Sequence, residues 1–190
     1  LMPSDSVIKK KMAEMPVFFD MTYNRIVKSY FKVYLKDKRE LTETVLGLSD
    51  YYFPYFESIL DAKNLPLELK HLPVIESALN PRAVSRVGAT RLWQFMYATG
   101  RFLDMEITSF VDERRDPVAS TYAAADYLNS LHEIFGDWTL ALAAYNCGPG
   151  NVNKAIRRSG GKTDFWDLYY YLPRETRGYV PGFIAVLYIF

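Results

Sequence analysis

Residues 116–150 read DPVASTYAAADYLNSLHEIFGDWTLALAAYNCGPG, and this stretch decides the fold class. Asp116 offers a side chain that can cap a helix, and Pro117 has the backbone angle of a first helical turn. Gly136 is placed where a helix commonly ends. Between these residues the apolar side chains recur at steps of four, three and four, at Ala124, Leu128, Leu131 and Phe135. The spacing predicts an α-helix with one apolar face.

The same period runs through the rest of the chain. After Gly136, Asp137 restarts a helix that continues through Asn146 and breaks at Gly148-Pro149-Gly150. No stretch shows the sustained alternation of a β-strand. Nearer the N-terminus, helical spacing places six apolar side chains on one stripe, namely Tyr23, Ile26, Val27, Tyr30, Phe31 and Tyr34. The sequence therefore predicts an all-α, multi-helix globular domain.

Capping signals predict the bounds of the other helices. A short helix after residue 40 is expected to end at Gly47, and a longer one to run from a cap at Ser49 or Asp50 to Asn64. Three further helices are expected toward the C-terminus, and they are predicted to start at Asn151, Thr163 and Pro173. Residues 1–47 are interpreted as an N-terminal helical extension that precedes the main domain.

The segment from Leu65-Pro66 to Asn80-Pro81 is predicted to form one helix. Proline suits its first turn, and the second Asn-Pro pair stops it. Pro73 lies inside the pattern and is expected to kink the helix, because proline has no backbone N–H. Residues 81–115 are expected to form a loop with short helical pieces, one of them at 90–99.

Glu76 falls on the apolar face of this predicted helix. It continues the steps of four, three, four and three that Leu65, Leu69, Leu72 and Leu79 define. A carboxylate on a buried face loses several kcal/mol of solvation unless it is paired or protonated. Burial therefore favours the neutral acid, which is the form that a general acid requires. The alternative is a carboxylate at the helix end that reaches solvent past Asn80.

Two other segments place polar side chains among apolar ones. Gln94 lies between large apolar residues in GATRLWQFM, residues 88–96. Asn146 ends a nearly pure apolar helix in ALAAYNCGPG, residues 141–150. Ser77 offers a hydroxyl directly after Glu76. Taken singly, each of these is also explained by a helix end or by a hydrogen bond to a backbone carbonyl.

Composition excludes several classes of function. The chain has 190 residues, with 23 Lys and Arg against 22 Asp and Glu, and this balance argues against a nucleic-acid-binding protein. The single cysteine, Cys147, excludes a disulfide framework. His71 and His132 belong to no metal-ligand motif, so no metal and no cofactor are expected. The longest apolar run, residues 183–190, is too short to span a bilayer. The chain looks like a piece of a longer protein.

Four motifs together resemble the lysozyme-like lytic transglycosylases of bacterial murein, closest to the membrane-bound D type. In order they are Glu76-Ser77-x-x-Asn80-Pro81, the 88–96 segment, Ala144-Tyr145-Asn146-x-Gly148-Pro149-Gly150, and Tyr179 within ETRGYVP, residues 175–181. The resemblance covers residues 48–190 and implies a lysozyme-like catalytic domain there. Arg91 stands where this family usually has glycine, and Tyr97 where it usually has proline. Because glycine permits backbone angles that arginine disfavours, Arg91 could change the shape of the loop in the second motif.

The resemblance also implies a reaction and its residues. The substrate is peptidoglycan, cleaved at the β-1,4 bond between N-acetylmuramic acid and N-acetylglucosamine, and the product carries a 1,6-anhydro ring. Glu76 acts first as the general acid and then as the base. The substrate-binding residues that it implies are Ser77, Gln94, Tyr145, Asn146 and Tyr179. It further implies a monomer in the periplasm or cell envelope, with membrane anchoring or cell-wall-binding repeats elsewhere in a longer protein.

Two alternatives remain open. One is a hydrolase like the goose-type lysozymes, which needs a second carboxylate or a positioned water. Asp112, Glu113 and Asp116 form the nearest acidic group, although a loop with a helix cap explains these residues better. The other alternative is a glycan-binding domain without catalysis.

Overall fold

The computed structural model describes residues 3–190, and within them it contains ten α-helices and no β-strand. The all-α prediction is confirmed. The chain divides into two compact units, each described separately below. The first unit holds the residues up to Asp37 together with Leu128–Ile189, and the second holds Lys38–Tyr127 with Phe190. Among the residues from 3 to 190, no helix is both long and apolar enough to cross a membrane.

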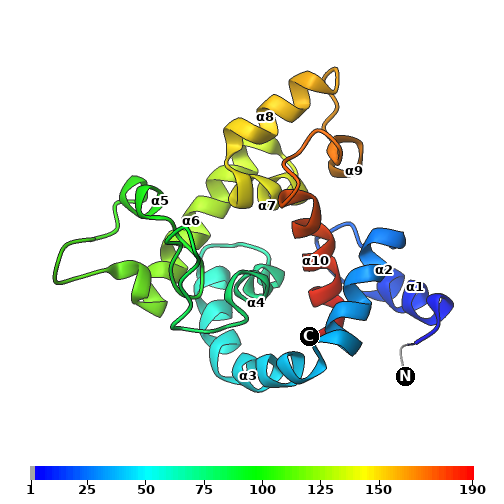
Figure 1. The fold of residues 1–190 in the computed structure, drawn as a ribbon, viewed down its shortest axis with the longest axis horizontal. Helices are drawn as coiled ribbons and strands as arrows, with labels where there is room; N and C mark the ends of the chain where they lie inside the picture. The colour runs from blue at the N-terminus through cyan, green and yellow to red at the C-terminus, as the bar shows by residue number, and fades with distance from the viewer. Residues whose placement is uncertain (1–2) are drawn as a thin grey trace. The chain divides into compact units, whose positions relative to one another are not determined.

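Helix α10 (Thr176–Ile189) forms the core of the first unit. It packs against α2 (Arg25–Lys32) and α7 (Trp138–Cys147), as Figure 1 shows for the red, blue and yellow segments. Its residues 180–187 are all buried. Phe183 meets the ring of Phe19 at 4.9 Å between centroids. The unit also contains α1 (Asp5–Glu14), the π-helix η1 (Val33–Asp37), α8 (Pro149–Arg158) and α9 (Phe165–Leu168).

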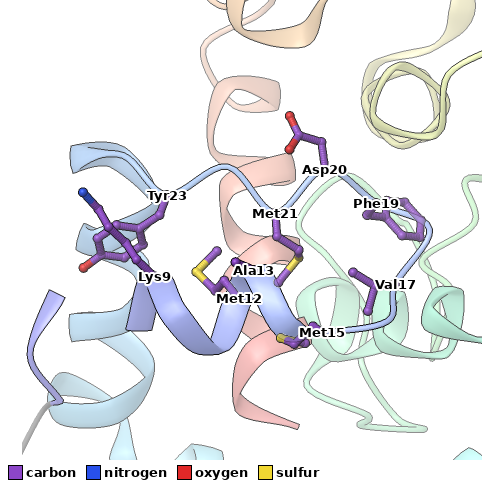
Figure 2. A pocket seen from close by; sticks show the side chains of 9 residues that line it. All are labelled: Lys9, Met12, Ala13, Met15, Val17, Phe19, Asp20, Met21 and Tyr23. Atoms are coloured by element: carbon purple, nitrogen blue, oxygen red, sulfur yellow. The ribbon is translucent and has the colours of Figure 1, made fainter. Parts of the chain in front are cut away.

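Helix α1 and the extended segment that follows it enclose a cavity of about 450 Å³. Figure 2 shows its lining, in which the thioether side chains of Met12, Met15 and Met21 come from both segments. Met12 and Ile8 are buried, so α1 is anchored through one face. Asn24 then caps α2, accepting from the backbone N–H groups of Ile26 and Val27, both at 3.0 Å. The helix predicted from the stripe at 23–34 is confirmed, with η1 as its continuation.

In the second unit, α3 (Arg39–Ala62) is one continuous helix. The predicted break at Gly47 is wrong, as is the predicted cap at Ser49 or Asp50. Gly47 costs a helix interior about 1 kcal/mol, and the buried apolar residues on both sides of it outweigh this. The hydroxyl of Ser49 donates to the carbonyl of Leu46 at 2.7 Å instead of capping a new helix. The end at Asn64 is correct, since that residue is left-handed with φ 54°.

The segment predicted as one kinked helix is two helices of different type. The 3₁₀-helix η2 (Leu67–His71) leads into α4 (Leu72–Ser77). Pro73 is the cause, because it has no N–H to donate to the carbonyl of Leu69. That carbonyl instead accepts from the N–H of Leu72, three residues on. All four leucines of the predicted stripe are buried, although Leu65 precedes the helices and Leu79 follows them.

Helix bounds after α4 differ from the predictions in four places, one of which is the start of α10, at Thr176 and not at the predicted Pro173. Residues 91–94 form turns, and helix α5 begins later, at Tyr97–Phe102. Helix α8 begins at Pro149, two residues before the predicted cap Asn151, and its N-cap residue is Gly148, which has a positive φ of 83°. Asp164 caps α9 in place of Thr163. The 3₁₀-helix η3 (Glu113–Arg115) precedes α6 (Pro117–Phe135), which has the predicted bounds and supplies residues to both units.

Candidate active site

Glu76 lies in the last turn of α4 and is half-buried. The helix ends immediately after it in a left-handed turn, with φ 53° at Ala78 and φ 55° at Leu79. The N–H of Ala78 donates to Val74 at 3.0 Å, and that of Leu79 donates to Pro73 at 3.2 Å. Glycine normally takes such a position, since left-handed angles cost other residues about 1–2 kcal/mol. Burial of the whole Leu79 side chain helps to hold the turn in place.

The hydroxyl of Ser77 joins α4 to the second motif. It lies 3.0 Å from the carbonyl oxygen of Pro73 and 3.1 Å from that of Leu92. A hydroxyl has one proton, which here is donated to a backbone carbonyl. Toward any other group Ser77 can therefore act only as an acceptor. The bond to Leu92 was not predicted, and the only signal for it in the sequence was a small hydroxyl residue beside Glu76.

Gln94 lies in the second motif, also in a left-handed conformation, with φ 51°. Its amide nitrogen donates to the carbonyl of Arg91 at 2.6 Å. One amide N–H and the amide oxygen remain for other partners. The neighbouring Trp93 is 1% exposed, and its indole N–H donates to the hydroxyl of Thr121 at 2.9 Å. Trp93 thus packs in the core of the second unit.

Arg91 adopts the backbone angle that a glycine takes freely, with φ 66°. Its N–H donates to the carbonyl of Ala83 and its guanidinium to that of Pro81, both at 2.7 Å. Its Nε is buried with no hydrogen-bond partner in the described part of the chain. The loop therefore keeps a glycine-like conformation despite the arginine, and the two bonds hold it against residues 81–83.

The first unit holds the other three predicted residues. Tyr145 and Asn146 end α7, and Tyr179 lies in the first turns of α10; all three are half-buried. The amide oxygen of Asn146 accepts from the hydroxyl of Thr176 at 2.8 Å, and Thr176 is completely buried. This bond ties the third motif to the fourth and leaves the two amide N–H groups of Asn146 as donors. Thr176 was missed in the sequence, although it lies in the quoted motif at 175–181.

The acidic group at 112–116 has structural roles. The carboxylate of Asp112 accepts from the guanidinium of Arg114 at 2.8 Å, and this hydrogen bond is the main reason that its pKa is lowered. Glu113 accepts from the backbone of Glu106 at 2.6 Å. Asp116 caps α6, as predicted, accepting from Val118 at 2.7 Å and from Ala119 at 2.9 Å. These contacts support the interpretation of the group as a loop with a helix cap.

The remaining candidates for chemistry are the thiol of Cys147 and side chains that could bind a metal ion. Burial raises the pKa of the Cys147 thiol, which disfavours the nucleophilic thiolate form. Residues 3–190 contain no group of three or more His, Cys, Asp or Glu side chains that could hold a metal ion. The first three motifs contain one carboxyl group, that of half-buried Glu76, together with amide, hydroxyl and phenol groups.

Comparison with known proteins decides the family. Residues 55–167 match the family described as the transglycosylase SLT domain. The chain belongs to this family. The membrane-bound lytic murein transglycosylase D of Escherichia coli K12 is 41% identical to it over 157 residues, which are 80% of this chain and 34% of that protein. The SLT domain match begins in α3 and ends in α9, and it includes the first three motifs.

Solved structures of family members share the fold. The 70 kDa soluble lytic transglycosylase of Escherichia coli superposes with a TM-score of 0.62 at 30% identity, over 73% of this chain and 24% of that one. A complex of the 70 kDa soluble lytic transglycosylase with bulgecin A superposes with a TM-score of 0.61 at 25% identity. This match covers 83% of this chain and 28% of that one. These matches confirm the predicted fold. The chain spans about a third of the length of its membrane-bound curated relative.

Proposed function

We propose that this SLT domain is the catalytic domain of a peptidoglycan lytic transglycosylase of the bacterial cell envelope. It cleaves the β-1,4 bond between N-acetylmuramic acid and N-acetylglucosamine and leaves a 1,6-anhydro ring on the muramic acid. The observation that carries the proposal is the placement of Glu76. Its half-buried carboxyl group lies in the last turn of a short helix, which is held by a left-handed turn and by the Ser77–Leu92 bond.

Glu76 performs both proton transfers in the proposed reaction. As the neutral acid it donates its proton to the glycosidic oxygen while the bond to C1 breaks. The resulting carboxylate then takes the proton of the C6 hydroxyl of the same muramic acid, and that oxygen attacks C1. Glu76 ends the cycle protonated again. The N-acetyl group of the substrate stabilises the cationic centre, so a second carboxylate is not needed.

The other motif residues bind the glycan in this proposal. The free amide groups of Gln94 and Asn146 suit the N-acetyl and hydroxyl groups of amino sugars, which both donate and accept hydrogen bonds. Ser77, which can only accept, suits the protonated rather than the ionised form of a neighbouring acid. Tyr145 and Tyr179 supply phenol groups on the helices that the Asn146–Thr176 bond ties together.

Product analysis tests the proposal. Purified sacculi are digested with the protein, and the released muropeptides are weighed by mass spectrometry. Anhydro products lack one water compared with the products of hydrolysis. We expect anhydro ends. Products that carry only reducing ends would instead identify a hydrolase, and no release at all would favour a glycan-binding domain.

A further inference from the structure

The first unit contains a second cavity, of about 1050 Å³, away from the Met-lined cavity of Figure 2. One wall is the start of α2, with Arg25, Ser29 and Tyr30. The other is the segment from Tyr169 to Gly178, which leads into α10. Figure 1 shows α2 and α10 side by side in this unit. The volume is at the upper end for ligand pockets, so a disaccharide or a short peptide can enter.

The walls combine arginine with tyrosine. Arg25, Arg174 and Arg177 contribute three positive charges against the single carboxylate of Glu175. The whole chain has a net charge of only +1, so this cluster of arginines is a local feature. Guanidinium groups bind carboxylates in a two-pronged geometry, and tyrosine rings offer flat faces with a polar edge. The composition therefore suits an organic anion.

Part of this wall is rigid. The guanidinium of Arg177 donates to the carbonyls of Leu172 at 3.1 Å and Tyr170 at 2.9 Å. The hydroxyl of Tyr30 lies against Gly178, where an added Cβ would meet it at 2.1 Å. Glycine is thus needed for this close approach, directly before the predicted substrate residue Tyr179. The cavity therefore borders the fourth motif.

Two of the three arginines remain available to a ligand. The guanidinium groups of Arg25 and Arg174 form no hydrogen bond or ion pair with any residue in the described part of the chain, and both side chains are exposed. They come from the two different segments that line the cavity, α2 and residues 169–178. A ligand that carries carboxylates can therefore contact both without first breaking a bond within the protein.

We propose that this cavity binds the carboxylate-bearing peptide stem of a peptidoglycan strand, with Arg25 and Arg174 as the groups that recognise it. The inference rests on the proposed function, because it assumes that murein is the substrate. Peptide stems are attached to the muramic acid at which the strand is cleaved, and they carry free carboxylates. The cavity would thereby favour strands that still have their stems over strands without them.

The test compares two forms of one substrate. Glycan strands with intact stems, and the same strands stripped by an amidase, are digested by the wild type and by the double variant Arg25→Gln/Arg174→Gln. We expect the KM for stem-bearing strands to rise at least about tenfold in the double variant, since each arginine contributes a charge-assisted hydrogen bond. The KM for stripped strands stays unchanged. Arg158→Gln, which removes an exposed arginine of α8 outside the cavity, changes neither.

Equal losses on both substrates, or no loss on either, would overturn the inference. A separate binding measurement distinguishes it from the proposed function. Binding of a purified N-acetylmuramyl tetrapeptide is followed by calorimetry with both proteins. If the wild type cleaves no strand but binds the muropeptide at least about tenfold more tightly than the double variant, the transglycosylase proposal fails and the stem site stands. Equal binding by the two proteins would overturn the stem site.

Discussion

The two units hold their predicted site residues on different kinds of backbone. Between residues 78 and 94 of the second unit, four residues other than glycine are left-handed: Ala78, Leu79, Arg91 and Gln94. In the described part of the first unit, only glycines have positive φ, among them Gly136 and Gly148. Tyr145, Asn146 and Tyr179 lie there on regular helices.

The difference shows where the molecule tolerates backbone strain. A left-handed residue other than glycine costs about 1–3 kcal/mol and persists only where its surroundings enforce it. In the second unit, buried Leu79 and the bonds of Ser77 and Arg91 supply that enforcement. Such strain gathers at functional sites in proteins. Here Ala78 and Leu79 follow Glu76 within three residues, and Arg91 and Gln94 flank Leu92, whose carbonyl accepts from Ser77.

The largest expected effect concerns His71, directly before α4. Burial lowers its pKa from 6.5 to about 4, while its ring nitrogen lies 2.8 Å from the carbonyl of Glu68. Because the folded pKa is depressed, the unfolded chain binds the proton first as the pH falls. We expect this residue to lower the free energy of unfolding by up to about 3 kcal/mol between pH 6.5 and pH 4.

Urea denaturation of the wild type and of His71→Gln across this pH range measures the effect of His71. The variant lacks the titrating ring, so its stability should depend less steeply on pH. Hydrogen exchange should show the loss first in the amides of η2 and α4. Parallel slopes for the two proteins would rule out a buried neutral histidine.

The next largest expected loss of stability lies in the first unit, where the backbone is regular but Gly178 is tightly packed against Tyr30. Gly178→Ala places a methyl group against the Tyr30 hydroxyl. We expect the free energy of unfolding to fall by about 1–3 kcal/mol through overpacking. Adding Tyr30→Phe removes the clashing oxygen and should recover part of this loss in a double-mutant cycle. Strictly additive losses would contradict the packing seen here.

Loss of the Ser77 hydroxyl should have a smaller effect. Ser77→Ala removes the link between α4 and the carbonyl of Leu92. We expect the free energy of unfolding to fall by about 1 kcal/mol, measured by thermal denaturation. The equivalent change in the first unit, Thr176→Val, removes the bond to Asn146 at a fully buried site and serves as the comparison. A stable Ser77→Ala protein with unchanged turnover would show that the link is dispensable.

The smallest expected effect is on the free energy of unfolding of Arg91→Gly, which should stay the same or rise rather than fall. Arg91→Gly relieves a left-handed angle and removes a buried, unpartnered Nε, while it loses the bond to Pro81. We expect these terms nearly to cancel, leaving the free energy of unfolding unchanged or raised by up to about 1 kcal/mol. A loss of more than about 1 kcal/mol would mean that the guanidinium bond holds the loop.

The sequence predicted the regular parts of the fold well. The bounds of α6 follow from Asp116-Pro117 and Gly136, and those of α7 from Asp137, because caps and period act locally. The continuous α3 could not be predicted from Gly47, since burial of residues far along the helix overrides a local breaker. The split at Pro73 followed from one missing N–H and was predicted as a kink.

Candidate site residues could be proposed from the sequence, but their contacts could not be predicted. The resemblance to the family proposed Glu76, Gln94 and Asn146 as site residues, and this stays a prediction. The left-handed turns at Ala78 and Arg91 could not be predicted, because a left-handed turn is usually indicated by glycine and neither residue is a glycine. Tertiary contacts enforce these two turns instead. The partners Leu92 and Thr176 lie 15 and 30 residues from Ser77 and Asn146, respectively, and no local pattern connects such pairs.

The most direct test of the central claim is Glu76→Gln, which keeps the shape of the side chain and removes its proton. We expect the release of anhydro-muropeptides from sacculi to fall at least about 100-fold, with an unchanged melting temperature and retained binding to sacculi. Glu40→Gln, an exposed residue in the first turn of α3, is the matched control and should retain full activity. Undiminished release by Glu76→Gln would contradict the account.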